Sequence, residues 1–309
     1  MGAAEARIAL CLLACSPAFA ADAPQADFNL SEPAPGVFVH LGRALPLDAP
    51  GHDDIANIGF IVGAKCVAVI DTGGSVRIGR ELNAAIVKHT PLPICYVINT
   101  HVHVDHVLGN AAFTYAKPSF VGNSRLVDAI ARSRNFFVTE YAADMDAPAS
   151  VAQVIGPDRL VEQDLNLDLG GRSLALHSWP KAHTDSDLTV YDAKTRTLWT
   201  GDLLFRERLP ALDGSLTGWL VSLDQLTAMQ VRLAVPGHGP TTHDAPAAIR
   251  EQRRYLQALH DGVREELARN ESIEHAIEHV AAAEQTHWLL WDKVHPHNVV
   301  RASQEAEWQ

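Results

Sequence analysis

The feature that most constrains this sequence is the run HVHVDH at residues 101–106, which follows an apolar segment, residues 95–100, that predicts a buried strand. Its four possible metal ligands are His101, His103, Asp105 and His106. On extended backbone, alternate side chains point the same way, so the first two histidines can reach one metal ion together. The other two residues lie where the chain turns into a predicted helix, and we expect them to reach a second ion.

Four side chains do not complete the coordination of two ions, and the sequence offers three more candidates at the ends of strand-like segments: His183 in AHTDSD, Asp202 in TGD and His238 in PGHG. We expect one ion to bind His101, His103 and His183, and the other to bind Asp105, His106 and His238. Asp202 can bridge both ions, because a carboxylate has two oxygens. Imidazole and carboxylate ligands suit Zn²⁺, and iron or manganese also fit them.

These motifs, THVHVDHVLGN, AHTDSD, TGD and PGHG in that order, resemble those of the metallo-β-lactamase fold superfamily. The resemblance covers about Val37 to His243. It implies an α/β fold (α+β by some schemes), an αββα sandwich of two β-sheets with the metals at one edge. It also implies that Asp71, in IDTG, does not bind a metal itself but supports a residue that does. The alternative role for Asp71 is a simple helix cap after the strand.

Within this superfamily the residue at position 202 discriminates between branches, because the zinc β-lactamases usually have Cys or Ser there. The aspartate is similar to that of glyoxalase II and other hydrolase branches with two metals. The C-terminal sequences REQRRYLQAL and WLLWDKVHPHNVVRASQEAEW resemble the quinoprotein relay system zinc metallohydrolases, also called SoxH-like proteins. That resemblance implies a link to a periplasmic quinoprotein dehydrogenase system.

The predicted activity is that of a dinuclear metallohydrolase. Two cations that share a water lower its pKa, and the resulting bridging hydroxide would attack an ester, thioester, lactone or amide carbonyl of a small-molecule substrate. Asp105 would orient this nucleophile and take its proton. Three residues that flank the ligand loops are expected to contact the substrate: Arg206, Arg208 and Trp219. Either Arg206 or Arg208 would bind a carboxylate group of the substrate. The alternative for these three is packing or ordinary surface charge.

Three other functions stay open. A zinc β-lactamase would turn over a chromogenic β-lactam with high efficiency. An enzyme with a single iron would do oxidative chemistry, as sulfur dioxygenases of the superfamily do. A non-catalytic metal-binding accessory protein of a periplasmic dehydrogenase would bind metal without turnover.

The composition of the chain limits which partners it can bind. The chain has 309 residues and a formal net charge of −12, which argues against nucleic acid and against an anionic membrane surface as partners. Residues 1–20 predict a signal peptide cut after Ala20 and hence a periplasmic or secreted protein; the alternative is a lipoprotein anchored at Cys15. No transmembrane segment is expected in the mature chain. The remaining cysteines, Cys66 and Cys95, are expected to be two buried thiols, with a bridge between them as the alternative.

Four regions are predicted: the signal peptide 1–20, an extended leader 21–35, the metallo-β-lactamase-like domain 36–245 and a C-terminal helical extension 246–309. Hairpins are expected at 58–73, 165–179 and 187–202. Helices are expected at 222–231, 246–269, 272–285 and 296–308. The motif His295-Pro296-His297 has metal-like spacing, but we interpret it as the start of the last helix.

Overall fold

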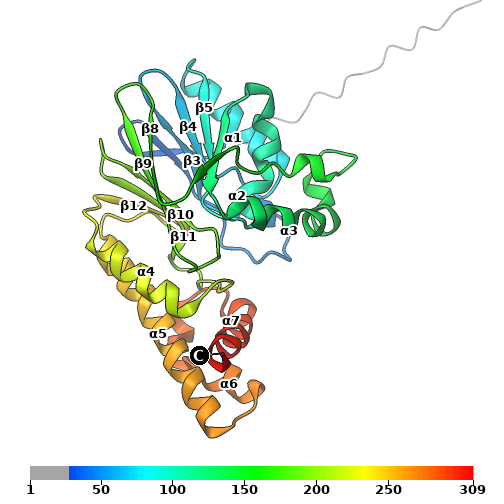
Figure 1. The fold of residues 1–309 in the computed structure, drawn as a ribbon, viewed down its shortest axis with the longest axis vertical. Coiled ribbons are helices and arrows are strands. Elements are labelled where there is room, and N and C mark those ends of the chain that lie inside the picture. The colour runs from blue at the N-terminus through cyan, green and yellow to red at the C-terminus, as the bar shows by residue number, and fades with distance from the viewer. Residues whose placement is uncertain (1–27, 309) are drawn as a thin grey trace, which may run out of the picture.

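The computed structural model describes residues 28–308. The predicted signal peptide, Cys15 and the first part of the predicted leader lie outside the described residues. Two β-sheets face each other, and helices pack against both of them (Figure 1). This is the αββα sandwich that the sequence predicts. Among the described residues, no helix is both long and apolar enough to cross a membrane.

The first sheet has seven strands in sequence order, antiparallel from β1 to β4 and parallel from β4 to β7. Its strands are β1 (Ser31–Ala34), β2 (Val37–His40), β3 (Ile58–Val62), β4 (Val67–Ile70), β5 (Ile94–Ile98), β6 (Ser119–Asn123) and β7 (Arg159–Val161). Part of the predicted leader is therefore a strand of this sheet, because β1 pairs with β2.

The second sheet has five strands in the order β12-β11-β10-β9-β8. They are β8 (Asp164–Asp168), β9 (Ser173–Ser178), β10 (Leu188–Asp192), β11 (Thr197–Phe205) and β12 (Leu233–His238). The pairs β8–β9 and β10–β11 confirm two of the three predicted hairpins, and β11 pairs with β12 in parallel.

The core follows the two-residue period of the strands. In the first sheet, Ile61 and Ile70 pack against the second sheet, while their neighbours Phe60 and Val69 face the opposite way, toward α1 (Val76–His89). Ser75 caps that helix, since its side chain accepts a hydrogen bond from Ile78 N. Both faces of the first sheet are therefore buried, which fixes the register of its strands.

The remaining helices lie at the edges and at one end of the sandwich. They are α2 (Val104–Val107), α3 (Leu126–Glu140), α4 (Leu216–Ala228), α5 (Ala245–Arg269), α6 (Ile273–His279) and α7 (Trp291–Glu307). Figure 1 shows α4, α5, α6 and α7 gathered at the lower end of the molecule. Buried apolar residues of α4, α5 and α7 form one cluster with β11, so the predicted extension shares a core with the sandwich.

Two predicted helix starts are wrong, each for a physical reason. Helix α4 begins at Leu216, six residues before the predicted start, because Ser215 caps it and the Glu305 carboxylate accepts from Leu216 N at 2.6 Å. A cap supplied by a residue so distant in the chain has no local signal. Helix α7 begins at Trp291, so Pro296 lies inside the helix and not at its first turn.

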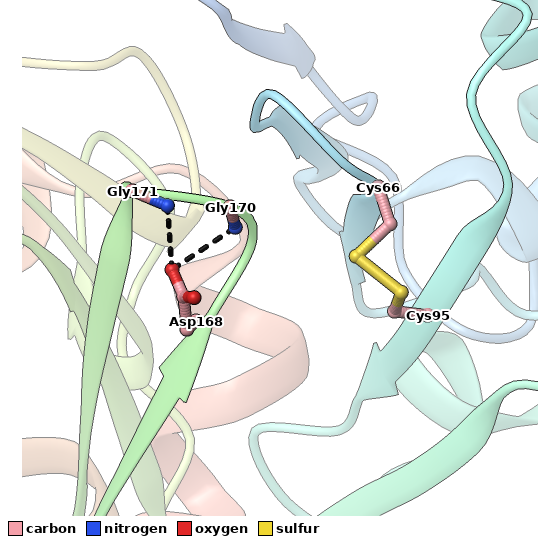
Figure 2. The surroundings of a disulfide bond; sticks show 5 residues. All are labelled: Cys66, Cys95, Asp168, Gly170 and Gly171. Atoms are coloured by element: carbon pink, nitrogen blue, oxygen red, sulfur yellow. Dashed lines mark hydrogen bonds between the residues drawn. A yellow bond between two sulfur atoms is a disulfide. The ribbon is translucent and has the colours of Figure 1, made fainter.

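The expectation of two free thiols is also wrong, because Cys66 and Cys95 form a disulfide (Figure 2). Cys66 immediately precedes β4 and Cys95 lies in the neighbouring strand β5. Parallel pairing of these strands brings the two Cα atoms to 5.7 Å, which is within the range that a disulfide spans. The bond ties two central strands of the first sheet together.

Candidate metal centre

All seven predicted ligands lie together in the structure, although they come from separate segments. One group contains His101, His103, His183 and Asp202, and the other contains Asp105, His106 and His238; within each group the ligand atoms all lie within 4.8 Å of one another. His101 follows β5, Asp105 and His106 lie in α2, Asp202 lies in β11 and His238 ends β12. The strand ends of both sheets therefore meet at this one edge.

Asp202 lies between the two groups. Its Oδ2 is 3.3 Å from His183 Nε2 and 3.3 Å from His238 Nε2, and its Oδ1 is 3.2 Å from His106 Nε2. One carboxylate thus faces ligand atoms of both groups, as the predicted bridge requires. Asp105 Oδ2 completes the second group at 3.4 Å from His238 Nε2.

The two glycines near Asp202 permit this approach. A Cβ at Gly237 would collide with Asp202 Oδ1, and a Cβ at Gly201 would collide with the Thr100 side chain. Gly201 also has a φ of +50°, which favours glycine. The TGD and PGH sequences therefore let β11 and β12 bring their ligands close together.

Hydrogen bonds behind the histidines fix which ring nitrogen faces the centre. The Nδ1 of His106 donates to Asp71 Oδ2 at 2.8 Å, and that of His183 donates to the Ala211 carbonyl at 2.7 Å. The Nδ1 of His238 lies 2.8 Å from the Ile55 carbonyl. In all three rings Nε2 is left for a ligand.

His103 has the opposite orientation, because its Nε2 lies 2.8 Å from Asp213 Oδ2. Its Nδ1 then faces His183 Nε2 at 3.0 Å. With both rings neutral and donating outward, two acceptor lone pairs point at each other across this distance. A proton or a metal ion between the two nitrogens relieves this repulsion, and the geometry of the pair fits a metal ion.

Buried polar atoms that lack hydrogen-bond partners also indicate a metal site. His101 Nε2, His106 Nε2 and Asp202 Oδ1 are buried and have no hydrogen-bond partner among the described residues. Buried polar atoms without a partner are costly, and these three face one another at the centre. The residues present therefore fit two metal ions.

Electrostatics favours the ligand forms of two of these groups. Burial, together with the neighbouring His106, holds the pKa of His101 well below its usual value. Burial raises the pKa of Asp202, but His238 and His106 outweigh it and hold that pKa well below its usual value. At neutral pH, His101 is therefore neutral and Asp202 is a carboxylate, as metal coordination requires.

Asp71 follows β4 and accepts hydrogen bonds from Thr100 as well as from His106. We expect Asp71→Asn to weaken metal binding about 10- to 100-fold, because the amide presents a donor where the His106 ring needs an acceptor. Asparagine tolerates the positive φ of 53° at this position, so the fold should persist. Competition with a chelator measures the affinity.

The control for this variant is Asp168→Asn in the β8–β9 turn, where Asp168 Oδ1 accepts from Gly170 N and Gly171 N (Figure 2). Asparagine keeps that acceptor, and the turn lies away from the centre, so the affinity should not change. Equal affinities for both variants and the unmodified chain would show that Asp71 does not support the metal site.

The three residues that are predicted to contact the substrate have different surroundings in the structure. Trp219 is fully buried, donates from Nε1 to the Leu203 carbonyl and packs against the His183 ring at 5.2 Å between centroids. It therefore supports a ligand from inside the core and does not reach a substrate. Arg206 donates from Nη1 to the carbonyls of Pro240 and Thr241.

Arg208 lies beside the centre, with its Nη1 3.2 Å from His238 Nδ1. It is buried, and no carboxylate of residues 28–308 forms an ion pair with it. It lines a cavity of about 280 Å³ together with Arg43, Arg206 and His238. Burial lowers the pKa of Arg208, although Asp105 and Asp202 oppose this effect. Arg208 forms no direct ion pair with a described carboxylate, so its donors can bind an anionic group in this cavity, although Glu207 also lines it.

Sequence reasoning missed the residues that orient His103 and His183, namely Asp213 and Ala211. Burial raises the pKa of Asp213, but hydrogen bonds with His103 and His297 outweigh it and hold the pKa below its usual value. Asp213 is therefore a carboxylate acceptor at neutral pH. It is far from His103 in the chain, and no local pattern connects the two.

Comparisons with known proteins agree with this site. The family model described as "Metallo-beta-lactamase superfamily" matches residues 52–238, which include all seven predicted ligands. A linear primary-alkylsulfatase from Pseudomonas sp. (strain ATCC 19151) is 24% identical over 241 residues, covering 65% of this chain and 45% of the relative. The chain thus spans less than half the length of that relative.

Solved structures share the fold. A metallo-beta-lactamase from Pontibacter korlensis superposes with a TM-score of 0.59 at 18% identity, over 74% of this chain and 98% of that one. A metallo-beta-lactamase family protein from Thermus thermophilus gives 0.63 at 19% identity, over 88% and 93%. The stereoselective inverting sec-alkylsulfatase Pisa1 from Pseudomonas sp. gives 0.64 at 16% identity, over 89% and 49%. The chain belongs to the metallo-β-lactamase superfamily.

Proposed function

We propose that this protein is a periplasmic dinuclear zinc hydrolase that attacks a carbonyl in an ester, thioester, lactone or amide. The observation that carries the proposal is the position of Asp202, whose two oxygens face both ligand groups at 3.2–3.3 Å. When bound, two Zn²⁺ ions lower the pKa of a water and polarise the oxygen of a substrate. The combined set of imidazoles and carboxylates suits zinc, and iron or manganese would also fit it.

The chain's own residues hold and orient the reactants. His101, His103 and His183 gather on the side where the substrate oxygen would lie, and Asp202 holds the two halves of the site together. Asp105, buried beside His106 and His238, would accept the proton of the attacking water at Oδ2. All of these ligand side chains except that of His103 are buried, which strengthens their electrostatic interactions.

We infer that Arg208 binds an anionic group of the substrate, since it is the buried cation beside His238 and forms no direct ion pair with a carboxylate among the described residues. Arg208→Gln should raise KM about 10- to 100-fold, the value of a hydrogen bond to a charged group, and leave the metal content unchanged. Steady-state kinetics measures this. Arg269→Gln, at an exposed pair with Glu265, is the control. An unchanged KM in the Arg208 variant would remove this role.

Location and partners are part of the proposal. The predicted signal peptide 1–20 supports a periplasmic protein, with the lipoprotein anchored at Cys15 as the alternative. The Cys66–Cys95 disulfide supports an oxidising compartment. The resemblance of the C-terminal sequences to quinoprotein relay system zinc metallohydrolases supports an association with a periplasmic quinoprotein dehydrogenase system.

A panel of substrates tests the function. The protein reconstituted with Zn²⁺ should hydrolyse members of an ester, thioester, lactone and amide panel, and chelation should abolish this. Efficient turnover of a chromogenic β-lactam would favour the β-lactamase instead. Full metal occupancy without turnover of any substrate would favour the accessory protein, and a single iron would favour oxidative chemistry.

A second candidate function is hydrolysis of an organic sulfate ester. The likeness to the alkylsulfatase and the cavity that Arg43, Arg206 and Arg208 line beside His238 favour it, because a sulfate group is anionic. An alkyl sulfate belongs in the same panel. Turnover of the sulfate ester with no turnover of any carbonyl substrate would replace the first proposal by this one.

A further inference from the structure

The C-terminal helix α7 contacts the loop that carries the outer partners of two predicted ligands. That loop, residues 210–213, supplies the Ala211 carbonyl to His183 Nδ1 at 2.7 Å and the Asp213 carboxylate to His103 Nε2 at 2.8 Å. Both histidines belong to the same ligand group. The position of this loop therefore sets the direction of two of the four ligands in that group.

The side-chain amide of Asn298, in α7, forms hydrogen bonds to the middle of the loop with both its oxygen and its nitrogen. Its Oδ1 accepts from Leu212 N at 2.9 Å, and its Nδ2 donates to the Pro210 carbonyl at 2.7 Å. The side chain is fully buried, and Nδ2 also donates to the Tyr255 hydroxyl at 2.9 Å. Leu212 and Pro210 flank Ala211, so these bonds fix the carbonyl that faces His183.

His297, the last residue of the HPH motif, holds the end of the loop. Its Nε2 lies 2.9 Å from Asp213 Oδ1, and the other oxygen of that carboxylate faces His103. The same nitrogen lies 3.1 Å from the Leu212 carbonyl. Arg301, one turn further along α7, donates from Nη2 to the Asp213 carbonyl at 2.7 Å.

We propose that α7 is a positioning element of the metal centre, in which His297, Asn298 and Arg301 hold loop 210–213 and thereby orient His103 and His183. This inference rests on the proposed metal centre. None of these three side chains is a catalytic residue, because each acts through the loop. All three lie beyond residue 238, where the match to the family model ends.

His297→Ala tests the proposal. The side chain is half-exposed, at 49%, so its loss should leave the thermal unfolding midpoint of the metal-free protein unchanged. Zinc affinity, measured by competition with a chromophoric chelator, should fall roughly tenfold for one of the two ions, the lower end of the range for partners of metal ligands. His297→Gln keeps a donor and should restore most of the affinity.

The matched control is His260→Ala, because His260 lies in α5 and also bonds to a carboxylate, that of Asp261 at 2.8 Å, but does not contact the loop. A double-mutant cycle gives the sharper readout. Asp213→Asn alone should weaken the same ion about 10- to 100-fold, and adding His297→Ala should cause little further loss, since the path through Asp213 is already broken.

Several outcomes would overturn the inference: unchanged affinity for both ions in His297→Ala, or losses that multiply in the double variant. Arg301→Met tests the same loop through a different bond and should weaken the same ion. An unmodified chain that binds no zinc would refute the proposed function itself. A chain that binds two ions with the same affinity in every α7 variant would refute only the role of α7.

Discussion

Asp202→Asn is expected to lower kcat/KM about 10³-fold, a loss of roughly 4 kcal/mol of transition-state stabilisation. Asp202 is the residue whose two oxygens face both ligand groups, at 3.2 Å from His106 Nε2 and 3.3 Å from His183 Nε2. An amide has one oxygen and no charge, so it cannot join two cations. The bound zinc should therefore fall from two ions per chain to one.

The control for this variant is Asp224→Asn, a 65% exposed carboxylate on α4 that pairs with Arg253. It should leave both the rate and the metal content unchanged, because exposed ion pairs contribute little. Kinetics and elemental analysis on the same preparations measure both quantities. An Asp202→Asn protein that keeps two ions and its rate would show that Asp202 does not bridge.

The largest effect on stability is expected at Arg172, which ties the two sheets together. Its Nε and Nη2 donate to the two oxygens of Asp192 at 3.0 and 2.7 Å, and its Nη1 donates to the Val62 carbonyl of β3 at 2.9 Å. Arg172→Met leaves the Asp192 charge buried and unpaired. We expect a loss of about 3–5 kcal/mol in the free energy of unfolding, and a fall of roughly 10 °C in Tm.

The variant Arg172→Met/Asp192→Asn separates charge from packing. Asparagine carries no charge to leave unpaired and can still accept from the turn at Lys194 N, so part of the lost stability should return. Arg132→Met, at an exposed pair with Asp185, should cost about 1 kcal/mol or less. Denaturant unfolding measures all three. Equal losses for Arg172→Met and Arg132→Met would refute the importance of the buried pair.

The sequence points to the seven candidate ligands, which the structure brings together, because local pattern and chemistry coincide in them. The HVHVDH run lies between a strand and a helix, and the glycines around Asp202 and His238 indicate close approach of the backbone. Asp71 can be recognised in the same way, because it directly follows the apolar residues of its predicted strand. These residues need only their immediate neighbours in the chain to be recognised.

What the sequence does not predict depends on contacts between distant segments. The bond between Asp213 and His297 joins residues 84 positions apart, and the cap of α4 by Glu305 joins residues 89 positions apart. The disulfide depends on the pairing of β4 with β5, which the positions of two lone cysteines do not show. The role of Trp219 is hard to predict because a tryptophan near a ligand loop can face either the substrate or the core.

A titration with Zn²⁺ tests most directly whether the chain binds two ions and needs both for activity. Metal-free protein is titrated with Zn²⁺ in a calorimeter, and hydrolysis of the best substrate in the panel is followed at each step. We predict two equivalents bound per chain, activity that reaches its maximum only when the second site fills, and complete loss on chelation. Binding of one equivalent or none, or hydrolysis that survives removal of all metal, would contradict the account.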